Sequence, residues 1–360
     1  MNKIILFSLS LLLLSSCNQR QNNIGYDSEY LNTISLVKVK SIKFAETKNF
    51  VLGTINDAVI WNNKFIISDG MTKIIWIFDN EYHLIKKMGG RGRGPGEYLS
   101  PPDLVLNKNK LLIVDYSNKK IDIIDKKFNL VATKSFPKEL IIQPFGWTSC
   151  GNFYVLTGAK PIASKKMNEL GSVLILDNNF KFKSNIFKWD DIYRTNAVFP
   201  IYNPFVRYVA GLNGSLFAVQ GAMPNKIHLF DNNFNLIKIF GREPKYFKIP
   251  PDVNLNNVMS SIEATAKYVS KISRINKLFY DKKNNYLISS YANYSENASY
   301  NHSNLSGQHY IQIFNKDFNC IYDGKIDGPL LFIDNGLLYV LISEKPNSLI
   351  INSYKTVLTR

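Results

Sequence analysis

Cysteine and histidine are scarce in this chain of 360 residues, which contains three cysteines and four histidines. Three cysteines cannot staple a domain of this size, so the chain is not a disulfide-rich scaffold. The histidines show no HExxH motif and no paired spacing, and no Ser/His/Asp arrangement or P-loop is present. The sequence therefore predicts no catalytic residues, no metal site and no cofactor.

Charged residues are also few, at 20% of the chain, whereas hydrophobic residues make up 45% and aromatic residues 13%. This composition excludes an intrinsically disordered chain, because such chains lack the apolar side chains that build a core. Acidic residues number 28 against 44 basic ones, which gives a formal net charge of +16. The excess favours anionic surroundings such as lipid head groups, acidic glycans or acidic peptides. Alternatively, it reflects a proteome rich in lysine and asparagine.

The N-terminal residues 1–17 read MNKIILFSLSLLLLSSC and have the layout of a secretion signal. Lys3 precedes an apolar run over residues 4–14, which is shorter than the roughly 20 residues that span a bilayer. The run ends in two serines and Cys17, an order that resembles the lipobox of bacterial lipoproteins. The resemblance implies cleavage before Cys17 and lipidation of this residue; the alternative is an ordinary signal peptide with an unrelated cysteine. We expect a signal peptide at 1–16, a lipid-anchored tether at 17–33 and the folded domain at 34–360.

The other two cysteines, Cys150 and Cys320, lie far apart in the sequence. They could pair in an exported protein, but neither lies in a CxxC motif or beside a histidine. Buried free thiols are therefore the favoured expectation.

A seven-residue phrase recurs five times along the chain. Each copy has an apolar residue, Asp or Asn, two polar residues, an aromatic residue, a polar residue and usually an apolar one. This pattern predicts a β-hairpin in which the Asp or Asn side chain starts the turn and the aromatic residue begins the return strand. The copies occupy residues 78–84, 124–130, 176–182, 230–236 and 314–320.

Two strand-like runs precede each copy, so every unit contains four short antiparallel strands, which is typical of a propeller blade. A sixth unit at the C-terminus supplies three strands, at 330–333, 337–342 and 348–354, and residues 35–42 alternate like an unassigned strand. We predict an all-β, six-bladed β-propeller whose ring is closed by the N- and C-terminal strands together, leaving no open edge. A β-sandwich would not explain five copies of one turn. Apolar residues at helical spacing within 253–272 predict one short helix between the fourth and fifth units.

A glycine-rich segment follows the first unit, reading GGRGRGPGEY over residues 89–98, with Pro101-Pro102-Asp103 after it. It resembles a signature of Bacteroidetes lipoproteins with six-bladed β-propellers, similar to the TolB-like and NHL-like groups. The resemblance, together with the lipobox, implies the propeller fold and an envelope location. Related propellers include lactonases and lyases, but their metal-ligand pattern does not map onto this chain.

The loops between second and third strands should open on the same face as the connections between blades. A second motif at 240–246 (FGREPKY) and long loops at 157–171 and 291–309 are expected there, and loops on a rigid scaffold are where binding residues concentrate. The tyrosines of the last loop could stack on sugars or peptide side chains, and its two histidines could hold a metal; by default the tyrosines pack the loop on itself and the histidines are solvated. The candidate binding residues are Arg91, Arg93, Glu97, Tyr98, Arg242, Tyr291, Tyr294, Tyr300, His302 and His309.

Two interpretations of the glycine-rich segment stay open. In the structural one, the glycines allow positive φ, Pro95 stiffens the crossover and Glu97 pairs with Arg91 or Arg93. In the functional one, the two arginines present bidentate donors to a carboxylate, phosphate or sulfate.

These observations favour a lipoprotein of the outer membrane, facing the periplasm and anchored in the membrane through Cys17. Its expected role is non-enzymatic binding or scaffolding of a peptide, glycan or envelope protein on the face that carries the loops. Nucleic acid is not an expected partner of an exported lipoprotein. The alternative function is a hydrolase or lyase with its site in the central channel.

Overall fold

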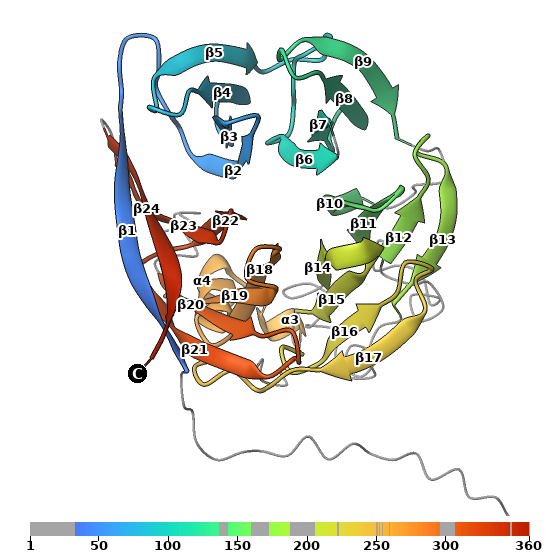
Figure 1. Cartoon of the computed structure of the whole chain (residues 1–360), viewed down its shortest axis with the longest axis vertical. Coiled ribbons are helices and arrows are strands. Elements are labelled where there is room, and N and C mark those ends of the chain that lie inside the picture. Colours follow the sequence, from blue (N-terminus) through green and yellow to red (C-terminus); the bar gives the residue numbers. More distant parts are fainter. Residues whose placement is uncertain are drawn as a thin grey trace, which may run out of the picture. The chain divides into compact units, whose positions relative to one another are not determined.

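The computed structural model describes residues 33–107, 109–136, 143–159, 173–187, 206–221, 223–249, 251, 253, 255–258, 260–295, 307–345 and 348–359. Within the unit Leu31–Arg360, six four-stranded antiparallel sheets are arranged as blades around a centre (Figure 1). The predicted six-bladed propeller is therefore confirmed.

The strands follow one another along the chain, four to a blade, from the innermost strand outward. Blades 1 and 2 comprise β2 (Ile55–Trp61), β3 (Lys64–Asp69), β4 (Ile74–Phe78) and β5 (Leu84–Gly89), then β6 (Asp103–Asn107), β7 (Lys110–Asp115), β8 (Lys120–Ile124) and β9 (Leu130–Ser135). Blades 3 and 4 comprise β10 (Gln143–Cys150), β11 (Phe153–Ala159), β12 (Val173–Leu176) and β13 (Phe182–Ile186), then β14 (Val206–Ala210), β15 (Leu216–Gln220), β16 (Ile227–Phe230) and β17 (Leu236–Phe240). Blade 5 comprises β18 (Ser273–Asp281), β19 (Tyr286–Tyr294), β20 (Gly307–Phe314) and β21 (Cys320–Ile326).

Blade 6 closes the ring with strands from both ends of the chain. It contains β22 (Leu330–Asp334), β23 (Leu337–Lys345) and β24 (Ser348–Leu358), and its outermost strand is β1 (Ile34–Ala45). The pairing of β1 with β24 runs from Ile34 opposite Leu358 to Ala45 opposite Ser348. Pairing of the two ends closes the ring, as the sequence predicted, and covers the edge of β24; the expectation that no edge stays open is wrong, because β1 itself forms the outer edge of blade 6.

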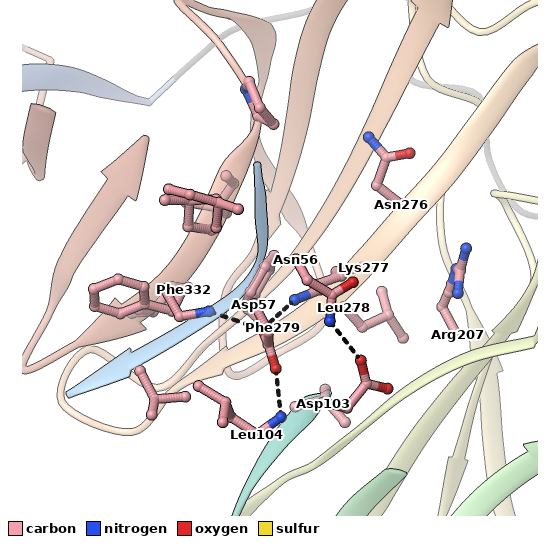
Figure 2. Close-up of a pocket in the computed structure, with 18 of the residues that line it drawn as sticks. Asn56, Asp57, Asp103, Leu104, Arg207, Asn276, Lys277, Leu278, Phe279 and Phe332 are labelled. Atoms are coloured by element: carbon pink, nitrogen blue, oxygen red, sulfur yellow. Dashed lines mark hydrogen bonds and ion pairs between the residues drawn. The ribbon is translucent and has the colours of Figure 1, made fainter. Parts of the chain in front are cut away.

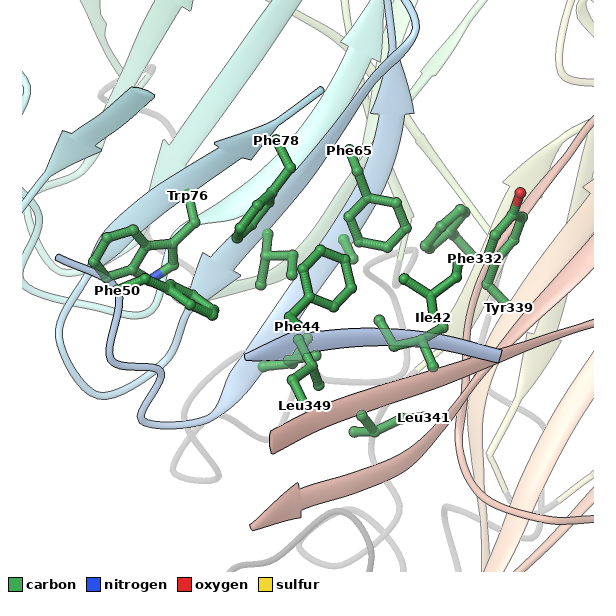
Figure 3. Packing of buried hydrophobic residues seen from close by; sticks show 14 residues of the cluster. Ile42, Phe44, Phe50, Phe65, Trp76, Phe78, Phe332, Tyr339, Leu341 and Leu349 are labelled. Carbon is green, nitrogen blue, oxygen red and sulfur yellow. The ribbon is translucent and has the colours of Figure 1, made fainter. Parts of the chain in front are cut away.

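The core lies between neighbouring blades. Phe44 of β1 packs against Phe78 of blade 1 with ring centroids 4.7 Å apart, and Phe65 lies 5.3 Å from Phe332 of blade 6 (Figure 3). The closing strand is thus hydrogen-bonded to blade 6 and packed on blade 1. Since burying one such side chain stabilises the fold by about 1.5–3 kcal/mol, this interface holds the ring shut.

In the five predicted hairpins, an Asp or Asn side chain stabilises the turn. Asp125 Oδ1 accepts hydrogen bonds from the N–H groups of Lys127 and Asn129, each at 2.9 Å, and Asn315 makes the equivalent pair at 3.0 Å. The predicted place of the aromatic residue is wrong, because it lies inside the turn at positive φ and the return strand begins two residues later. Its N–H donates to the Asp or Asn carbonyl, and its left-handed backbone brings the carbonyl of the next residue to the Asp or Asn N–H. These aromatics are Tyr82, Phe128, Phe180, Phe234 and Phe318, with φ between +60° and +69°.

The connection from β17 to β18 contains the predicted helical segment, divided into α3 (Leu255–Val258) and α4 (Ile262–Val269). Ser261 precedes the second helix, and its side chain accepts a hydrogen bond from the Ala264 N–H at 3.0 Å and so caps the first turn. In the described part of the chain, no helix is both long and apolar enough to cross a membrane.

Cys150 and Cys320 are free thiols, as favoured from the sequence; Cys150 is buried and Cys320 half-buried. Burial raises the pKa of the Cys150 thiol to about 11. Cys17 lies outside the described residues, so the lipobox stays a prediction.

Candidate functional site

The glycine-rich loop folds back on itself between β5 and β6. The Tyr98 N–H donates to the Gly90 carbonyl at 2.8 Å, and the Gly92 N–H donates to the Tyr98 carbonyl at 3.2 Å. Gly90 has φ of +136°, which a side chain would make costly. The Glu97 carboxylate accepts a hydrogen bond from the Gly94 N–H at 2.9 Å. Glu97 therefore supports the loop backbone, whereas its expected ion pair with either arginine is absent from the described residues.

Contacts with blade 2 hold the glycine-rich loop in place. Tyr98 is completely buried, and the Lys120 ammonium lies 5.1 Å from the centre of its ring and donates to the Gly94 carbonyl at 2.9 Å. Burial, followed by the charge of Asp122, raises the pKa of the Tyr98 hydroxyl, which keeps it neutral. Arg91 and Arg93 are exposed at the tip.

The second motif surrounds a stack of tyrosines beside blade 5. Tyr310 lies between Tyr246 and Tyr291, with ring centroids 4.9 Å and 5.1 Å away. The Tyr291 hydroxyl donates to Asp323 at 3.5 Å, and burial raises the pKa of this carboxyl although the Lys245 N–H, Gln312 and the charge of Arg242 act against the rise. Arg242 thus lies close to a buried carboxylate.

The predicted bounds of the loop at 291–309 are wrong. The pairing of β19 with β20 continues to Tyr294 opposite Gly307, so Tyr291 and His309 belong to the sheet. Both are buried, at 1% and 3% exposure, and His309 is not the solvated loop histidine that was expected by default. Tyr300 and His302 lie outside the described residues.

The ring encloses a cavity of about 710 Å³ at its centre, lined mainly by the innermost strands (Figure 2). Ile55, Asp103 and Leu330 line it and are the first residues of β2, β6 and β22. The lining extends from these first residues to Val209, Tyr280 and Ile333 near the ends of β14, β18 and β22, so the cavity runs along the channel from the side where the chain enters each blade. We call this side the connection face. Tyr294, one of the predicted binding residues, lines the same cavity from the end of β19.

Backbone bulges determine which side chains reach this cavity. In β2, Ile55 pairs with Asp69 and Asp57 pairs with Ser68, so Asn56 is an extra residue. Bulges of this kind re-aim the side chains next to them. In β18 the extra residue is Asn276, followed by Lys277. Both bulged asparagines and the charged residues after them line the cavity.

An ion pair joins the two bulged strands. Lys277 Nζ lies 2.7 Å from Asp57 Oδ1, and the Leu104 N–H of blade 2 donates to Asp57 Oδ2 at 3.0 Å (Figure 2). The Asp57 side chain is only 14% exposed and that of Lys277 is 43% exposed. Asp57 thereby ties blades 1, 2 and 5 together, and the partly exposed ammonium remains at the cavity surface.

A second carboxyl group, that of Asp103, lies beside this pair. It accepts hydrogen bonds from Asn56 Nδ2 at 3.1 Å and from the Tyr116 hydroxyl at 2.5 Å. Burial, and then the negative charge of Asp57, raises the pKa of Asp103 above its ordinary value. Two carboxyl groups in unequal environments, next to a lysine, are a recurrent basis of acid and base chemistry.

Arg207 and Asn276 complete the polar wall. Arg207 Nε donates to the Ile275 carbonyl at 3.1 Å, which holds the guanidinium of β14 against β18. The Tyr294 hydroxyl donates to Asn276 Oδ1 at 3.3 Å, so this contact occupies the amide oxygen of Asn276 and not its nitrogen. The remaining wall is largely apolar, formed by residues such as Val59 and Leu331.

Sequence reasoning missed this channel cluster except Tyr294. Pro101-Pro102-Asp103 was noticed as part of the glycine-rich motif, but no sequence signal marked Asp57, Arg207 or Lys277. Among the described residues, no group of three His, Cys, Asp or Glu side chains could hold a metal ion.

Comparison with solved structures finds the same fold in other proteins. The chain is similar to a DUF4221-family protein from Bacteroides vulgatus, with a TM-score of 0.64 and 15% sequence identity, over 91% of this chain and 99% of that chain. It is also similar to a Bacteroides fragilis protein that is described as exported, with a TM-score of 0.59 and 12% identity, over 93% of this chain and 98% of that chain. At these identities the likeness shows the fold alone.

No curated protein matches the chain. The propeller part of the resemblance drawn from the sequence is confirmed, because residues 20–193 match the model of the family DUF5128, which is described as a 6-bladed beta-propeller.

Proposed function

We propose that this protein is a non-enzymatic binding propeller of the cell envelope, whose ligand enters the central cavity from the connection face. The cavity of about 710 Å³ carries the proposal, because it combines apolar walls with a cluster of fixed polar groups. Ligand pockets commonly have this composition and a volume of about 300–1,000 Å³. A peptide, a glycan or a segment of an envelope protein would fit such an opening.

The envelope location rests on two supports. The first is the lipobox resemblance at Cys17, which would anchor the mature chain in the outer membrane with the propeller facing the periplasm. The second is the description of the similar Bacteroides fragilis protein as exported. Arg91, Arg93 and Arg242 would then supply positive charge around the ligand, outside the cavity itself.

Affinity capture with a blocked channel tests the function. The bait is purified protein of residues 18–360, offered detergent-solubilised envelope beside a Thr148→Trp variant, which places an indole in the cavity that Thr148 lines. A Lys134→Trp variant, at an exposed position of β9, controls for the added ring. We expect a component that is retained by the parent and the control but lost by Thr148→Trp. Equal retention by all three proteins would overturn a role for the cavity.

An Arg91→Ala/Arg93→Ala variant in the same experiment separates the glycine-rich loop from the channel. If this folded variant also loses the component, the ligand also contacts the glycine-rich loop on the connection face, outside the cavity. If it retains the component, the arginines have no part in binding and the loop is architectural.

The channel carboxyl groups favour one further candidate, a hydrolase or lyase. The specific observation is the raised pKa of Asp103 beside Asp57 and Lys277. An enzyme would convert many moles of envelope peptide or glycan per mole of protein, with products detected by mass spectrometry. An Asp103→Asn variant would form none of these products. Stoichiometric retention of an unchanged ligand would exclude this candidate.

A further inference from the structure

The channel wall formed by Arg207, Asn276 and Lys277 is rich in hydrogen-bond donors. Lys277 has three ammonium donors, of which Asp57 takes one at 2.7 Å. The amide oxygen of Asn276 accepts from Tyr294, which leaves its NH₂ group as the end available to a ligand. The guanidinium of Arg207 is fixed by its hydrogen bond to the Ile275 carbonyl, two residues before Lys277.

Two features hold these donors in place. Asn276 is the bulged residue of β18, and the Ser290 side chain braces the bulge: the Lys277 N–H donates to Ser290 Oγ at 3.2 Å, and Ser290 Oγ donates to the Lys277 carbonyl at 3.1 Å. Asp57 fixes the lysine side chain from the other side. Preorganised donors bind an anion without a further loss of side-chain entropy.

The charges around the cavity determine which anion fits. Arg207 and Lys277 contribute two positive charges, and Asp57 offsets one of them. Burial and the charge of Asp57 raise the pKa of Asp103, and its two oxygens accept hydrogen bonds from Asn56 and Tyr116. Because the Asp57 carboxylate lies beside these donors and repels a dianion more strongly than a monoanion, the cavity favours a singly charged group over a dianionic phosphate. A planar guanidinium also matches the two oxygens of a carboxylate.

We infer that the cavity binds its ligand through a carboxylate group held by Arg207, Asn276 and Lys277, with the ligand's apolar part against Val59, Val209 and Leu331. This inference rests on the proposed function and names its ligand chemistry. The C-terminus of a peptide and a uronic acid both supply such a group.

Four probes test the inference by isothermal titration against folded protein of residues 18–360. N-acetyl-Ala-Phe with a free carboxylate is compared with its amide, and glucuronate with glucose. We expect at least one of the acids to bind and its neutral partner to bind at least about tenfold more weakly, since a charged hydrogen bond is lost. The acid that binds identifies the source. Equal binding of each acid and its neutral partner, or binding of none, would overturn the inference.

Variants locate the carboxylate. Lys277→Met and Asn276→Asp are expected to weaken binding of the acid about tenfold or more, and Lys134→Met, on the outer strand of blade 2, to leave it unchanged. Thermal unfolding of each variant identifies any that fails to fold, and Arg207→Gln then provides an independent substitution. Acid binding that survives all three cavity substitutions in folded protein would contradict the assignment. Failure of every probe, combined with envelope capture that Thr148→Trp abolishes, would reject the carboxylate while leaving the proposed function intact.

Discussion

Asp115, at the end of β7, provides the strongest test of how the glycine-rich loop keeps its shape. The side chain is fully buried, and its carboxylate accepts hydrogen bonds from the Leu99 N–H at 2.9 Å, the Ser100 hydroxyl at 2.6 Å and the Asn118 amide at 2.7 Å. An Asp115→Asn substitution removes the charge and turns an NH₂ group toward some of these donors. Leu99 and Ser100 follow the loop directly, so its C-terminal end would lose its attachment.

The expected loss can be estimated from these contacts. Each hydrogen bond to a charged group contributes about 1.5–3 kcal/mol, and a buried donor without a partner costs about 1–3 kcal/mol. Because one oxygen acceptor remains, we expect Asp115→Asn to lower the free energy of unfolding by about 3–5 kcal/mol at pH 7. At roughly 2–4 °C per kcal/mol, Tm should fall by about 6–20 °C. Urea unfolding followed by tryptophan fluorescence, with thermal circular dichroism, measures both.

Asp125→Asn is the matched control. Asp125 caps the exposed hairpin of blade 2 through two backbone N–H groups, and Asn315 performs the same role in blade 5 with nearly equal distances. The control should therefore change stability by less than about 0.5 kcal/mol, the range of a neutral surface substitution. If Asp115→Asn is as harmless as Asp125→Asn, the carboxylate does not hold the loop and the reasoning is refuted.

The stabilisation by the Asp115 carboxylate should depend on pH. Burial alone would raise the pKa of Asp115, but hydrogen bonds from Ser100, Leu99 and Asn118 outweigh burial and hold the pKa below its ordinary value. The stabilisation is therefore complete above the unfolded-state pKa of about 3.9 and is lost as the pH falls through the folded-state value. The difference between the parent and Asp115→Asn should shrink from pH 7 to pH 3. A difference that is constant over this range would contradict a role for the charge.

Three further outcomes follow from the same geometry. Gly92→Ala should cost about 1 kcal/mol, because the new Cβ would overlap the Glu97 carboxylate, and Glu97→Ala in the same chain should restore part of that loss in a double-mutant cycle of unfolding. Cys150 should not react with Ellman's reagent at pH 8 until the protein is denatured, since its thiol is buried and has a pKa of about 11; rapid native labelling would contradict this. Asp57→Ala should lower the free energy of unfolding in urea by about 2–3 kcal/mol, because the Asp57 carboxylate also accepts the Leu104 N–H. Lys277→Met should lower it by at most about 1 kcal/mol, because the ion pair is partly exposed. Equal losses in the two variants would show that the ion pair dominates.

The sequence predicted the blades because their signals are local. The turn phrase puts its Asp or Asn within four residues of the N–H groups that it accepts from, so five copies could be recognised without knowing the fold. Ring closure could be predicted from the number of strands, because the last unit has three strands and the N-terminal segment supplies the fourth. The ends of β19 and β20 were missed because Tyr291 and His309 stand among Tyr, Asn and Ser residues that also occur in loops.

The channel site could not be predicted in this way. Asp57 and Lys277 are 220 residues apart, and their contact depends on how six blades close. Each residue also follows a bulge, and a bulge is a shift between two strands that leaves no mark in either one alone. A polar residue within an otherwise apolar strand is the one trace of such a site in the sequence, but it does not show which partner it meets.

The same bulges explain how one scaffold can carry a specific site. The innermost strands β2, β18 and β22 each insert one residue beside the cavity, Asn56, Asn276 and Leu331, while the pairing resumes unchanged after it. The inserted residue is free of the alternation that forces every second side chain of a strand into the core. Two polar insertions and one apolar insertion therefore set the character of the cavity, and the blade cores on either side do not change. Substituting these residues should alter what the channel binds far more than it alters the stability of the ring.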